Sequence, residues 1–294
     1  YRGACRCIYV IYWCTVFPLF IEKGNAKEMI LQADKLTLQY GQKIIADKLD
    51  FKVDKSEIIS IIGPNGSGKS TLLKSLGRLL KPTHGTVLLE GKDIQKMKPG
   101  DIARKMSILP QSSTAPMDMT VYDLVCYGRM PHQGLFSSPN KIDEEKIEEA
   151  LTQTNTSHMR YRRLDTLSGG ERQRAWLAMA IAQNPEILLL DEPTTYLDVK
   201  HQLDLMNLVY KLYETRRITV IMVLHDLNHA ARYSHRLVAV KKGKIFAEGL
   251  VQDVFTEKIL CDLYDVETSV MSLEQNGQKH LVCFPYDVKQ GEKN

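Results

Sequence analysis

The stretch IISIIGPNGSGKS, residues 58–70, decides the fold of this 294-residue chain. Its first five residues are β-branched except for one serine, as in a strand that is buried on both faces of a parallel sheet. The next eight match the pattern G-x-x-x-x-G-K-[ST], in which a glycine-rich backbone turns its N–H groups toward phosphate oxygens just before a helix begins. The sequence therefore predicts a strand, a phosphate-binding loop and then a helix over residues 70–80.

The side chains of this loop have distinct expected roles toward a nucleotide. Lys69 is expected to reach the β- and γ-phosphates, Ser70 to hold Mg²⁺, and Thr71 to support the α-phosphate. The residues expected to bind ATP in this region are Gly63, Pro64, Asn65, Gly66, Ser67, Gly68, Lys69, Ser70 and Thr71.

A second apolar segment, residues 187–190, ends in two acids and is predicted to be a buried strand. Asp191 at its tip can approach Mg²⁺, either directly or through a water molecule. Glu192 can polarise an attacking water as a general base. A strand that ends in solvated charge would look the same in isolation, but the phosphate loop upstream favours the catalytic interpretation.

Three single residues complete the predicted site. His225 follows the apolar strand 218–224, at the strand end where open α/β sheets place ligands, so we expect it at the γ-phosphate. Gln111 follows residues 108–110 and can touch Mg²⁺ or the lytic water. Tyr40 ends a strand, and its ring can stack on adenine. Taken alone, Gln111 and Tyr40 are more typical of structural positions; the neighbouring motifs favour function.

Strands and helices alternate along the chain, which indicates an α/β fold with a parallel sheet. Residues 112–165 interrupt this alternation and are predicted to be an inserted helical segment. Further predicted elements are a strand over 31–40, helices over 141–151 and 175–182, and a hairpin with arms 268–273 and 279–284 around Asn276-Gly277.

The pentapeptide Leu167-Ser168-Gly169-Gly170-Glu171 precedes the apolar helix. Ser168 and Glu171 have the spacing of a capping box, so the helix is predicted to begin here. The two glycines leave backbone N–H groups exposed at the positive end of the helix, where they can receive an anion.

Composition and charge exclude several classes of protein. Apolar residues make up 44%, charged residues 25% and the net charge is +4, which favours neither a nucleic-acid-binding tail nor a trap for acidic substrates. The six cysteines contain no C-x-x-C pair, so zinc and redox motifs are not indicated, and a reduced cytosolic compartment fits best.

The first 28 residues differ from the rest of the chain. Residues 7–21 are nearly all apolar, shorter than the roughly 20 residues that a membrane span needs. A signal peptide and a short membrane-lying anchor are alternatives, but we favour a non-native or unstructured extension that precedes a start at Met29. The expected division is therefore an extension (1–28), an ATPase domain (29–265) and a C-terminal hairpin with a polar tail (266–294).

Together, these motifs resemble the ATP-binding subunit of ABC transporters over about residues 30–260. The resemblance implies a P-loop NTPase (RecA-like) core with an antiparallel β subdomain and an inserted α-helical subdomain. It identifies residues 63–70 as the Walker A loop, and Asp191 and Glu192 as the end of the Walker B motif. Residues 167–171 would be the signature and residues 196–198 the D-loop. The single positions are Gln111 as the Q-loop, His225 as the switch histidine and Tyr40 as the adenine-stacking residue.

The resemblance also implies partners and a location. Two copies would face each other head to tail, with ATP between residues 63–71 of one copy and Ser168, Gly169, Gly170 and Asp198 of the other. A separate permease would form the pore, a substrate-binding protein would act indirectly, and no nucleic acid would be bound. The chain would lie peripherally on the cytoplasmic face of the membrane. It would couple ATP hydrolysis, with Mg²⁺, to transport.

Within the family, the chain is similar to ferric-siderophore uptake ATPases, and most to their ferric-hydroxamate branch. The segments that carry this similarity are residues 108–111 with 120–121, residues 127–134, residues 168–176 and residues 224–233. Importers of haem, cobalamin or another metal chelate are alternatives, and a soluble ABC ATPase acting on DNA or ribosomes is a distant one. Glu171 stands where Gln is commoner, and residues 155–163 depart from the family pattern, which bears on partner and cargo.

Overall fold

The computed structural model describes residues 28–289 except for residues 113, 117, 134–139 and 276. The predictions for residues 1–27, for Gly134 and for Asn276 in the hairpin turn lie outside the described residues. No described helix has both the length and the apolar character that are needed to cross a lipid bilayer.

The central sheet has the strand order β10-β9-β3-β8-β7-β6. Its strands are β3 (Ile58–Ile62), β6 (Met106–Leu109), β7 (Ile187–Asp191), β8 (Thr219–Val223), β9 (Arg236–Lys241) and β10 (Lys244–Leu250). β3 pairs in parallel with β8 and β9, and β7 pairs in parallel with β6 and β8, whereas β10 is antiparallel to β9. Because β3, β7 and β8 are buried at every position, their near-continuous aliphatic runs match a sheet covered on both faces.

An antiparallel sheet with the order β2-β1-β4-β5 lies beside this core. Its strands are β1 (Met29–Tyr40), β2 (Lys43–Asp54), β4 (His84–Leu89) and β5 (Lys92–Asp93). Helix α1 (Lys69–Leu76) contacts β1 and β2 as well as β7 and β8, so its apolar residues Leu72, Leu73 and Leu76 join the two sheets in one core. The short helix α2 (Pro99–Lys105) leads into β6.

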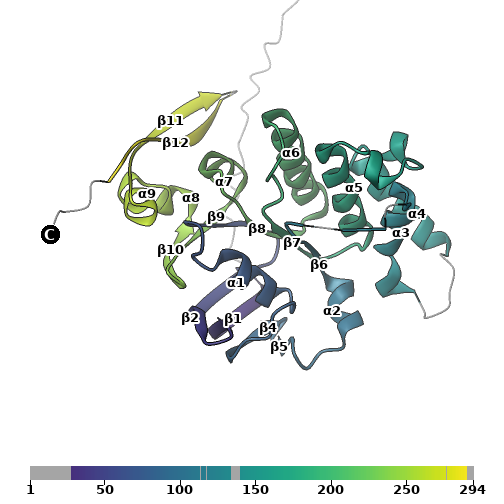
Figure 1. Cartoon of the computed structure of the whole chain (residues 1–294), viewed down its shortest axis with the longest axis horizontal. Helices are drawn as coiled ribbons and strands as arrows, with labels where there is room; N and C mark the ends of the chain where they lie inside the picture. The colour runs from purple at the N-terminus through teal and green to yellow at the C-terminus, as the bar shows by residue number, and fades with distance from the viewer. Residues whose placement is uncertain (1–27, 113, 117, 134–139, 276, 290–294) are drawn as a thin grey trace, which may run out of the picture.

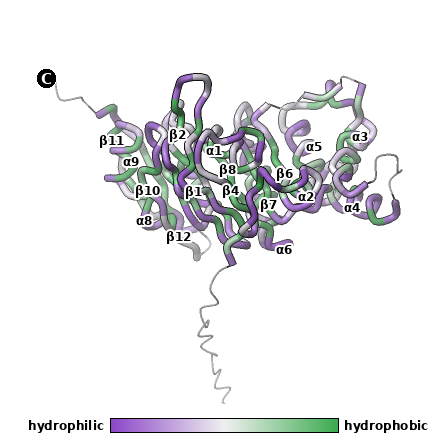
Figure 2. Tube along the Cα trace, turned by 90° about the horizontal axis from the view of Figure 1, so that it is seen from below, coloured by the Kyte–Doolittle hydropathy of each residue, from purple (hydrophilic) through white to green (hydrophobic). Residues whose placement is uncertain are grey.

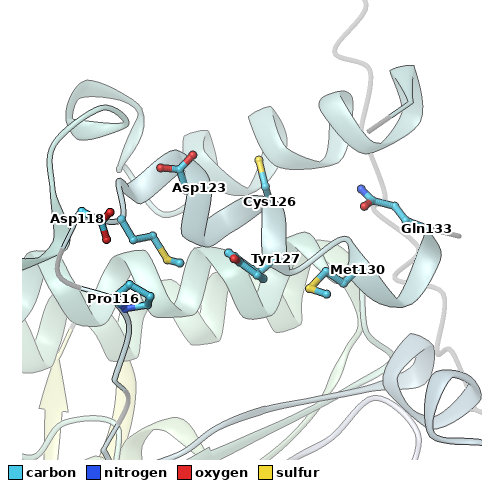
Figure 3. A pocket seen from close by; sticks show the side chains of 8 residues that line it. Pro116, Asp118, Asp123, Cys126, Tyr127, Met130 and Gln133 are labelled. Carbon is cyan, nitrogen blue, oxygen red and sulfur yellow. The ribbon is translucent and has the colours of Figure 1, made fainter. Parts of the chain in front are cut away.

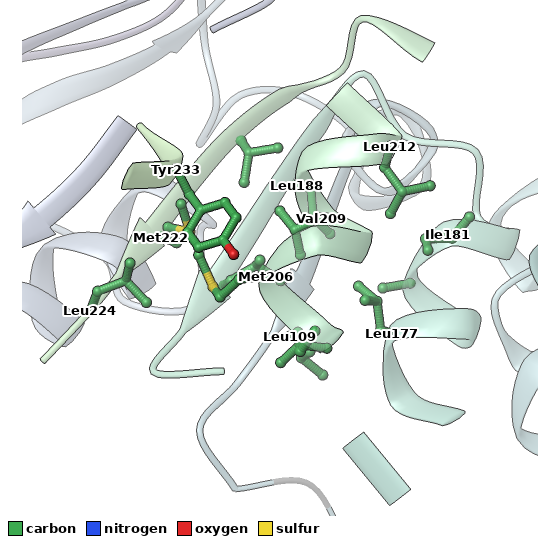
Figure 4. Packing of buried hydrophobic residues seen from close by; sticks show 14 of the residues in the cluster. Leu109, Leu177, Ile181, Leu188, Met206, Val209, Leu212, Met222, Leu224 and Tyr233 are labelled. Carbon is green, nitrogen blue, oxygen red and sulfur yellow. The ribbon is translucent and has the colours of Figure 1, made fainter. Parts of the chain in front are cut away.

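The other face of the central sheet is covered by helices. These are α5 (Gly169–Ala182), α6 (Val199–Arg216) and α7 (Leu227–Tyr233). Beyond α5 lie α3 (Val121–Tyr127) and α4 (Lys141–Gln153), and the 3₁₀ turns of this region are η1 (Met130–His132), η2 (Ser157–Met159) and η3 (Leu164–Thr166). Figure 4 shows Leu177 and Ile181 of α5 in one cluster of buried apolar side chains with Val209 and Met206 of α6. Helix α5 also packs against α3 and α4, so it joins the helical segment to the core.

The C-terminal part adds α8 (Val251–Val254), α9 (Glu257–Tyr264) and the hairpin of β11 (Val266–Gln275) and β12 (Gln278–Val288). The hairpin packs against α7 and α9 and projects from the end of the molecule that carries β10. In Figure 2, hydrophobic segments run through the interior and hydrophilic ones are frequent at the edges.

The structure corrects some predicted boundaries. The helix predicted over residues 70–80 ends at Leu76, because Gly77 caps it and Arg78 adopts the left-handed conformation (φ 60°). The helix predicted from residue 175 begins at Gly169, where the capping box had placed a helix start. Both arms of the predicted hairpin are longer than their apolar alternation suggested. The α/β fold itself is confirmed.

Candidate functional site

The candidate site lies at the carboxyl ends of the parallel strands. The loop of residues 63–68 follows β3, Gln111 follows β6, Glu192 follows β7, and His225 follows β8. Since parallel strands end at the same edge of a sheet, residues separated by more than 150 positions in sequence meet here. The structure thus brings together the loop and the three predicted catalytic side chains.

The phosphate loop has a backbone that only glycine accommodates. Gly66 (φ 76°) and Gly68 (φ 104°) adopt positive φ, and Gly68 is the residue before α1. Gly63 (φ 146°) lies so close to β9 that a Cβ atom there would be 2.1 Å from the carbonyl oxygen of Val240. The loop is therefore pressed against the sheet on one side and leads into the N-terminus of α1, the end of a helix that attracts anions.

Lys69 is almost fully buried, with 5% of its surface exposed. Its Nζ atom donates hydrogen bonds to the carbonyl oxygens of Gly63 (2.9 Å) and Pro64 (3.0 Å). Burial lowers the pKa of the Lys69 ammonium, while the nearby carboxylates of Glu192 and Asp191 oppose that shift. The ammonium is held inside the loop, where phosphate oxygens would neutralise it.

Asp191, the last residue of β7, is buried, and its Oδ1 atom has no hydrogen-bond partner among the described residues. Burial raises the pKa of this carboxyl, against a hydrogen bond from Ser70 and the positive charges of Lys74 and Lys69. An unpaired buried carboxylate beside a hydroxyl is costly unless something compensates it. The pair offers the hard oxygen donors that Mg²⁺ prefers, so Asp191 and Ser70 fit such an ion.

Glu192 is the centre of a group of polar side chains. Its Oε1 atom lies 2.6 Å from Nε2 of His225, while its Oε2 atom accepts hydrogen bonds from Nε2 of Gln111 (2.5 Å) and Oγ1 of Thr195 (3.3 Å). The Glu192 backbone is in the left-handed region (φ 52°), a strained conformation for a residue other than glycine. A carboxylate held by donors on both oxygens, beside a phosphate loop, can orient and deprotonate a water molecule.

The pentapeptide of residues 167–171 forms the predicted capping box. The backbone N–H of Ser168 donates to Oε2 of Glu171 (2.9 Å), and the backbone N–H of Glu171 donates to Oγ of Ser168 (3.3 Å). The backbone hydrogen bond from Ser168 lowers the pKa of Glu171, helped by Arg162, whose guanidinium lies 2.8 Å from Oε1. Among the described residues, no hydrogen bond or ion pair joins Ser168–Gly170 to the phosphate loop of the same chain.

Gly170 packs tightly against the start of α6. A Cβ atom on Gly170 would lie 2.5 Å from Cδ2 of His201, whereas one on Gly169 would meet nothing nearer than a Leu197 side-chain atom at 3.8 Å. The His201 ring in turn lies 2.7 Å from Asp198, which caps α6 by accepting the His201 backbone N–H. Asp198 therefore positions the ring that fixes the second glycine.

Tyr40 lies at the end of β1, half exposed, and pairs with Lys43 across the turn into β2. The neighbouring strand β2 lies close to the loop: a Cβ atom on Gly68 would be 3.1 Å from the carbonyl oxygen of Ile45. The structure thus places Tyr40 on the sheet that flanks the phosphate loop.

Sequence reasoning missed three residues of the site: Thr195, His201 and Tyr264. Thr195 and His201 each lie three residues after a predicted site residue, a spacing that could have indicated them. Tyr264 is different, because its hydroxyl accepts the backbone N–H of Gly63 (2.8 Å) from a position 201 residues away. No pattern in the sequence signals that contact.

The helical segment carries a surface cavity of about 710 Å³. Figure 3 shows its lining, with Tyr127 and Met130 from the segment 127–133 and the carboxylates of Asp118 and Asp123. Behind it, Arg129 is buried, pairing with Asp143 at 2.9 Å and donating to the carbonyl oxygen of Ala182 at 2.7 Å. The segment that signalled the hydroxamate branch in sequence therefore fastens α4 to the end of α5.

Comparison with known proteins agrees with the motifs and the geometry described above. The family model described as ABC transporter matches residues 46–195. The chain is 44% identical over 263 residues to the iron(3+)-hydroxamate import ATP-binding protein FhuC of Bacillus subtilis (strain 168), covering 90% of this chain and 97% of that protein. It is 47% identical over 256 residues to the petrobactin import ATP-binding protein FpuD of Bacillus anthracis, covering 87% and 93%.

Solved structures show the same fold. An inward-facing metal-chelate type ABC transporter matches with a TM-score of 0.77 and 26% identity, over 88% of this chain and 98% of that one. A dimeric ATP-binding cassette in a post-hydrolysis state, bound to ADP and Pi, matches with a TM-score of 0.66 and 28% identity, over 76% of this chain and 99% of the other.

Proposed function

Since this chain belongs to the ABC transporter family, we propose that it is the ATP-hydrolysing subunit of an importer of iron(III)-siderophore complexes. ATP binding and hydrolysis follow from the family. The cargo, the partners and the roles of individual residues are our inference from the site and from the relatives' functions.

The observation that carries the catalytic proposal is the Glu192 carboxylate, hydrogen-bonded by Gln111 and paired with His225 beside the phosphate loop. We assign Glu192 as the general base, His225 as the residue that holds the water and the γ-phosphate, and Gln111 as a contact to the water and to Mg²⁺. Lys69 and the loop bind the phosphates, and Tyr40 stacks on adenine. Positioning and charge stabilisation supply most of the rate in such phosphoryl transfers.

Mg²⁺ would be held by Ser70 and Asp191, with Gln111 nearby. This is supported by the unpaired buried Oδ1 atom of Asp191, which a divalent cation would compensate. When bound, Mg²⁺ would neutralise charge on the transferring phosphate. Ser70 and Asp191 would supply oxygen donors, while Lys69 balances the phosphate charge from inside the loop.

We assign Ser168, Gly169 and Gly170 to the ATP held by a second copy of this chain, with Asp198 supporting the contact through His201. Their N–H groups stand at the start of a capped helix and are not used by the phosphate loop of their own chain. A dimeric cassette bound to ADP and Pi has the same fold, which supports a head-to-tail pair.

The helical segment is the proposed contact to a membrane permease. Its cavity is open, mixed in polarity and lined by the half-exposed Tyr127 and Met130 together with Asp118 and Asp123. Residues with this mixture of aromatic, thioether and acidic groups suit a short amphipathic segment of another protein. Such a contact would place the chain peripherally on the cytoplasmic face of the membrane, with a substrate-binding protein delivering cargo on the other side.

The cargo is inferred from relatives alone, because an ATPase subunit of this kind does not touch what is transported. Both relatives described above are named for import of siderophores, one of hydroxamate and one of petrobactin. The experiment is deletion of the gene, followed by growth on defined iron sources. Loss of growth on ferric siderophores, restored by the wild-type chain but not by Glu192→Gln, is expected. Growth that depends on this gene only with haem, or only with cobalamin, would contradict the cargo.

A further inference from the structure

One contact of the phosphate loop comes from the C-terminal part of the chain. The Tyr264 hydroxyl, at the last residue of α9, accepts the backbone N–H of Gly63 at 2.8 Å. Gly63 is the first residue after β3, and its other side is closed by the Val240 carbonyl of β9, 2.1 Å from where a Cβ would stand. Gly63 is thus held between a strand and a side chain from a remote helix.

The same residue also holds the lysine of the loop. The Gly63 carbonyl oxygen accepts a hydrogen bond from Lys69 Nζ at 2.9 Å. The two peptide groups of Gly63 therefore link the Tyr264 hydroxyl to the Lys69 ammonium through one backbone residue. A displacement of Gly63 would move the acceptor that positions Lys69, because the N–H bound by Tyr264 and the carbonyl bound by Lys69 belong to the same residue.

Several contacts fix Tyr264 itself. Leu260 and Leu263 of α9 are fully buried, and α9 packs against β9 and β11. The turn after Tyr264 is tied by Lys241, whose ammonium donates to the Asp265 carboxylate (2.8 Å) and to the Asp262 carbonyl. Figure 1 shows α9 beside β9 and β10, on the side of the sheet that carries the hairpin.

The hydroxyl is suited to act as a stable acceptor. Burial raises the pKa of Tyr264, so the group stays neutral across the physiological range while its oxygen accepts the Gly63 N–H. Removing it would leave a backbone donor beside the phosphate loop without its partner, which costs more than the loss of an exposed hydrogen bond.

We propose that Tyr264 is a positioning residue for ATP binding: its hydroxyl fixes Gly63, and Gly63 presents the carbonyl that holds Lys69 at the phosphates. This inference rests on the proposed role of Lys69 and the loop. Tyr264 does not touch the nucleotide. The C-terminal helix, outside the motifs that define the site, therefore contributes to the affinity for the phosphate chain.

The test compares Tyr264→Phe with Tyr233→Phe in the full chain. Tyr233 is buried and Tyr264 is partly buried. The Tyr233 hydroxyl donates a hydrogen bond to Oδ1 of Asn207 at 2.8 Å, a contact that does not involve the phosphate loop. Each substitution removes only a hydroxyl. The measurements are KM and kcat for MgATP, and the inhibition constant of tripolyphosphate, which has the phosphate chain without adenine.

For Tyr264→Phe, we expect KM for ATP and the inhibition constant of tripolyphosphate to rise together by about fivefold, as loss of one hydrogen bond allows. We expect kcat to change by less than about twofold, because the contact supports binding before and during the reaction alike. Tyr233→Phe should lower thermal stability but leave both constants at their wild-type values.

If the wild-type chain hydrolyses ATP and Tyr264→Phe leaves both constants unchanged, the inference is overturned. Equal shifts of the constants in Tyr264→Phe and Tyr233→Phe would also overturn it. A wild-type chain without ATPase activity would instead overturn the proposed function and this inference with it. If Tyr264→Phe does not fold, Lys241→Gln loosens the same turn and should raise both constants by about twofold; no rise in that variant would count against the inference.

Discussion

Nε2 of His225 lies 2.6 Å from Oε1 of Glu192, although the two residues follow different strands of the central sheet. Gln111 donates to the other carboxylate oxygen from a third strand at 2.5 Å. Each of the three side chains follows the end of a parallel strand, so the strand order of the sheet brings them close together. This triangle is the part of the site on which the catalytic proposal depends.

Glu192→Gln is expected to bind MgATP and to dimerise while losing nearly all hydrolysis. The amide keeps the size of the side chain but cannot accept a proton from water, and loss of a general base typically costs about 10²–10⁴-fold in rate. Steady-state phosphate release measures the rate, and size-exclusion chromatography with MgATP measures the dimer. Near-normal turnover would show that another group is the base.

Gly170→Ala and Gly169→Ala are expected to differ in stability although they are adjacent. The new methyl at residue 170 would lie 2.5 Å from the His201 ring, and at residue 169 it would lie 3.8 Å from Leu197. Overpacking of this kind costs about 1–3 kcal/mol, so only the first change should lower the free energy of unfolding substantially.

Urea titration of the nucleotide-free chain measures this difference. Equal stability of the two alanine variants would mean that His201 can swing away from Gly170 at little cost. The crowding at Gly170 would then not fix the start of α5.

Asp191→Asn is expected to stabilise the nucleotide-free chain at neutral pH while abolishing Mg²⁺-dependent hydrolysis. Because burial raises the folded-state pKa of Asp191, the folded chain binds its proton more tightly than the unfolded chain, whose Asp pKa is about 3.9. The carboxyl therefore reduces stability as pH rises from about 4 through the raised pKa, and the neutral amide removes that cost.

Thermal unfolding of Asp191→Asn and of the wild type at neutral pH and near pH 4 measures this effect. The stability gained by the amide should be largest at neutral pH and should shrink toward pH 4. If Asp191→Asn is less stable than the wild type at both pH values, the buried Asp191 carboxylate is not an uncompensated charge in the nucleotide-free chain.

Arg129→Ala is expected to cost about 3–5 kcal/mol, because it leaves the buried Asp143 carboxylate without its cation. Lys146→Ala removes one of the two cations that pair with the partly exposed Glu149, the other being Arg216, and should cost at most about 1 kcal/mol. Chemical denaturation of both variants measures the contrast. Similar small losses would mean that the Arg129 pair does not fasten the helical segment.

The same pair predicts an acid dependence. Burial alone would raise the pKa of Asp143, but hydrogen bonds from Arg129 and from the Asn140 backbone outweigh it and lower the pKa. The pair's contribution is therefore present above the unfolded-state pKa of about 3.9 and is lost as pH falls through the lower folded value. The stability difference between the wild type and Asp143→Asn should accordingly shrink below about pH 4.

The sequence by itself determined the parts of this protein that are local. Glycines in the spacing of residues 63–70, aliphatic runs before Gly63 and Asp191, and the capping box of Ser168 and Glu171 each predict a conformation from neighbouring residues. These predictions indicated the loop, the strands and the start of α5, because backbone sterics and capping act within a few residues. The shorter α1 was missed because Gly77 and Arg78 end it through packing and backbone geometry.

Only the tertiary structure decided which distant groups meet. Strand order placed Gln111 and His225 on the two oxygens of Glu192, and it brought Tyr264 to the backbone of Gly63. Contacts of this kind depend on how helices and strands pack, and that packing is driven by the burial of apolar surface over the whole chain. The sequence spacing of two such residues therefore does not predict that they touch.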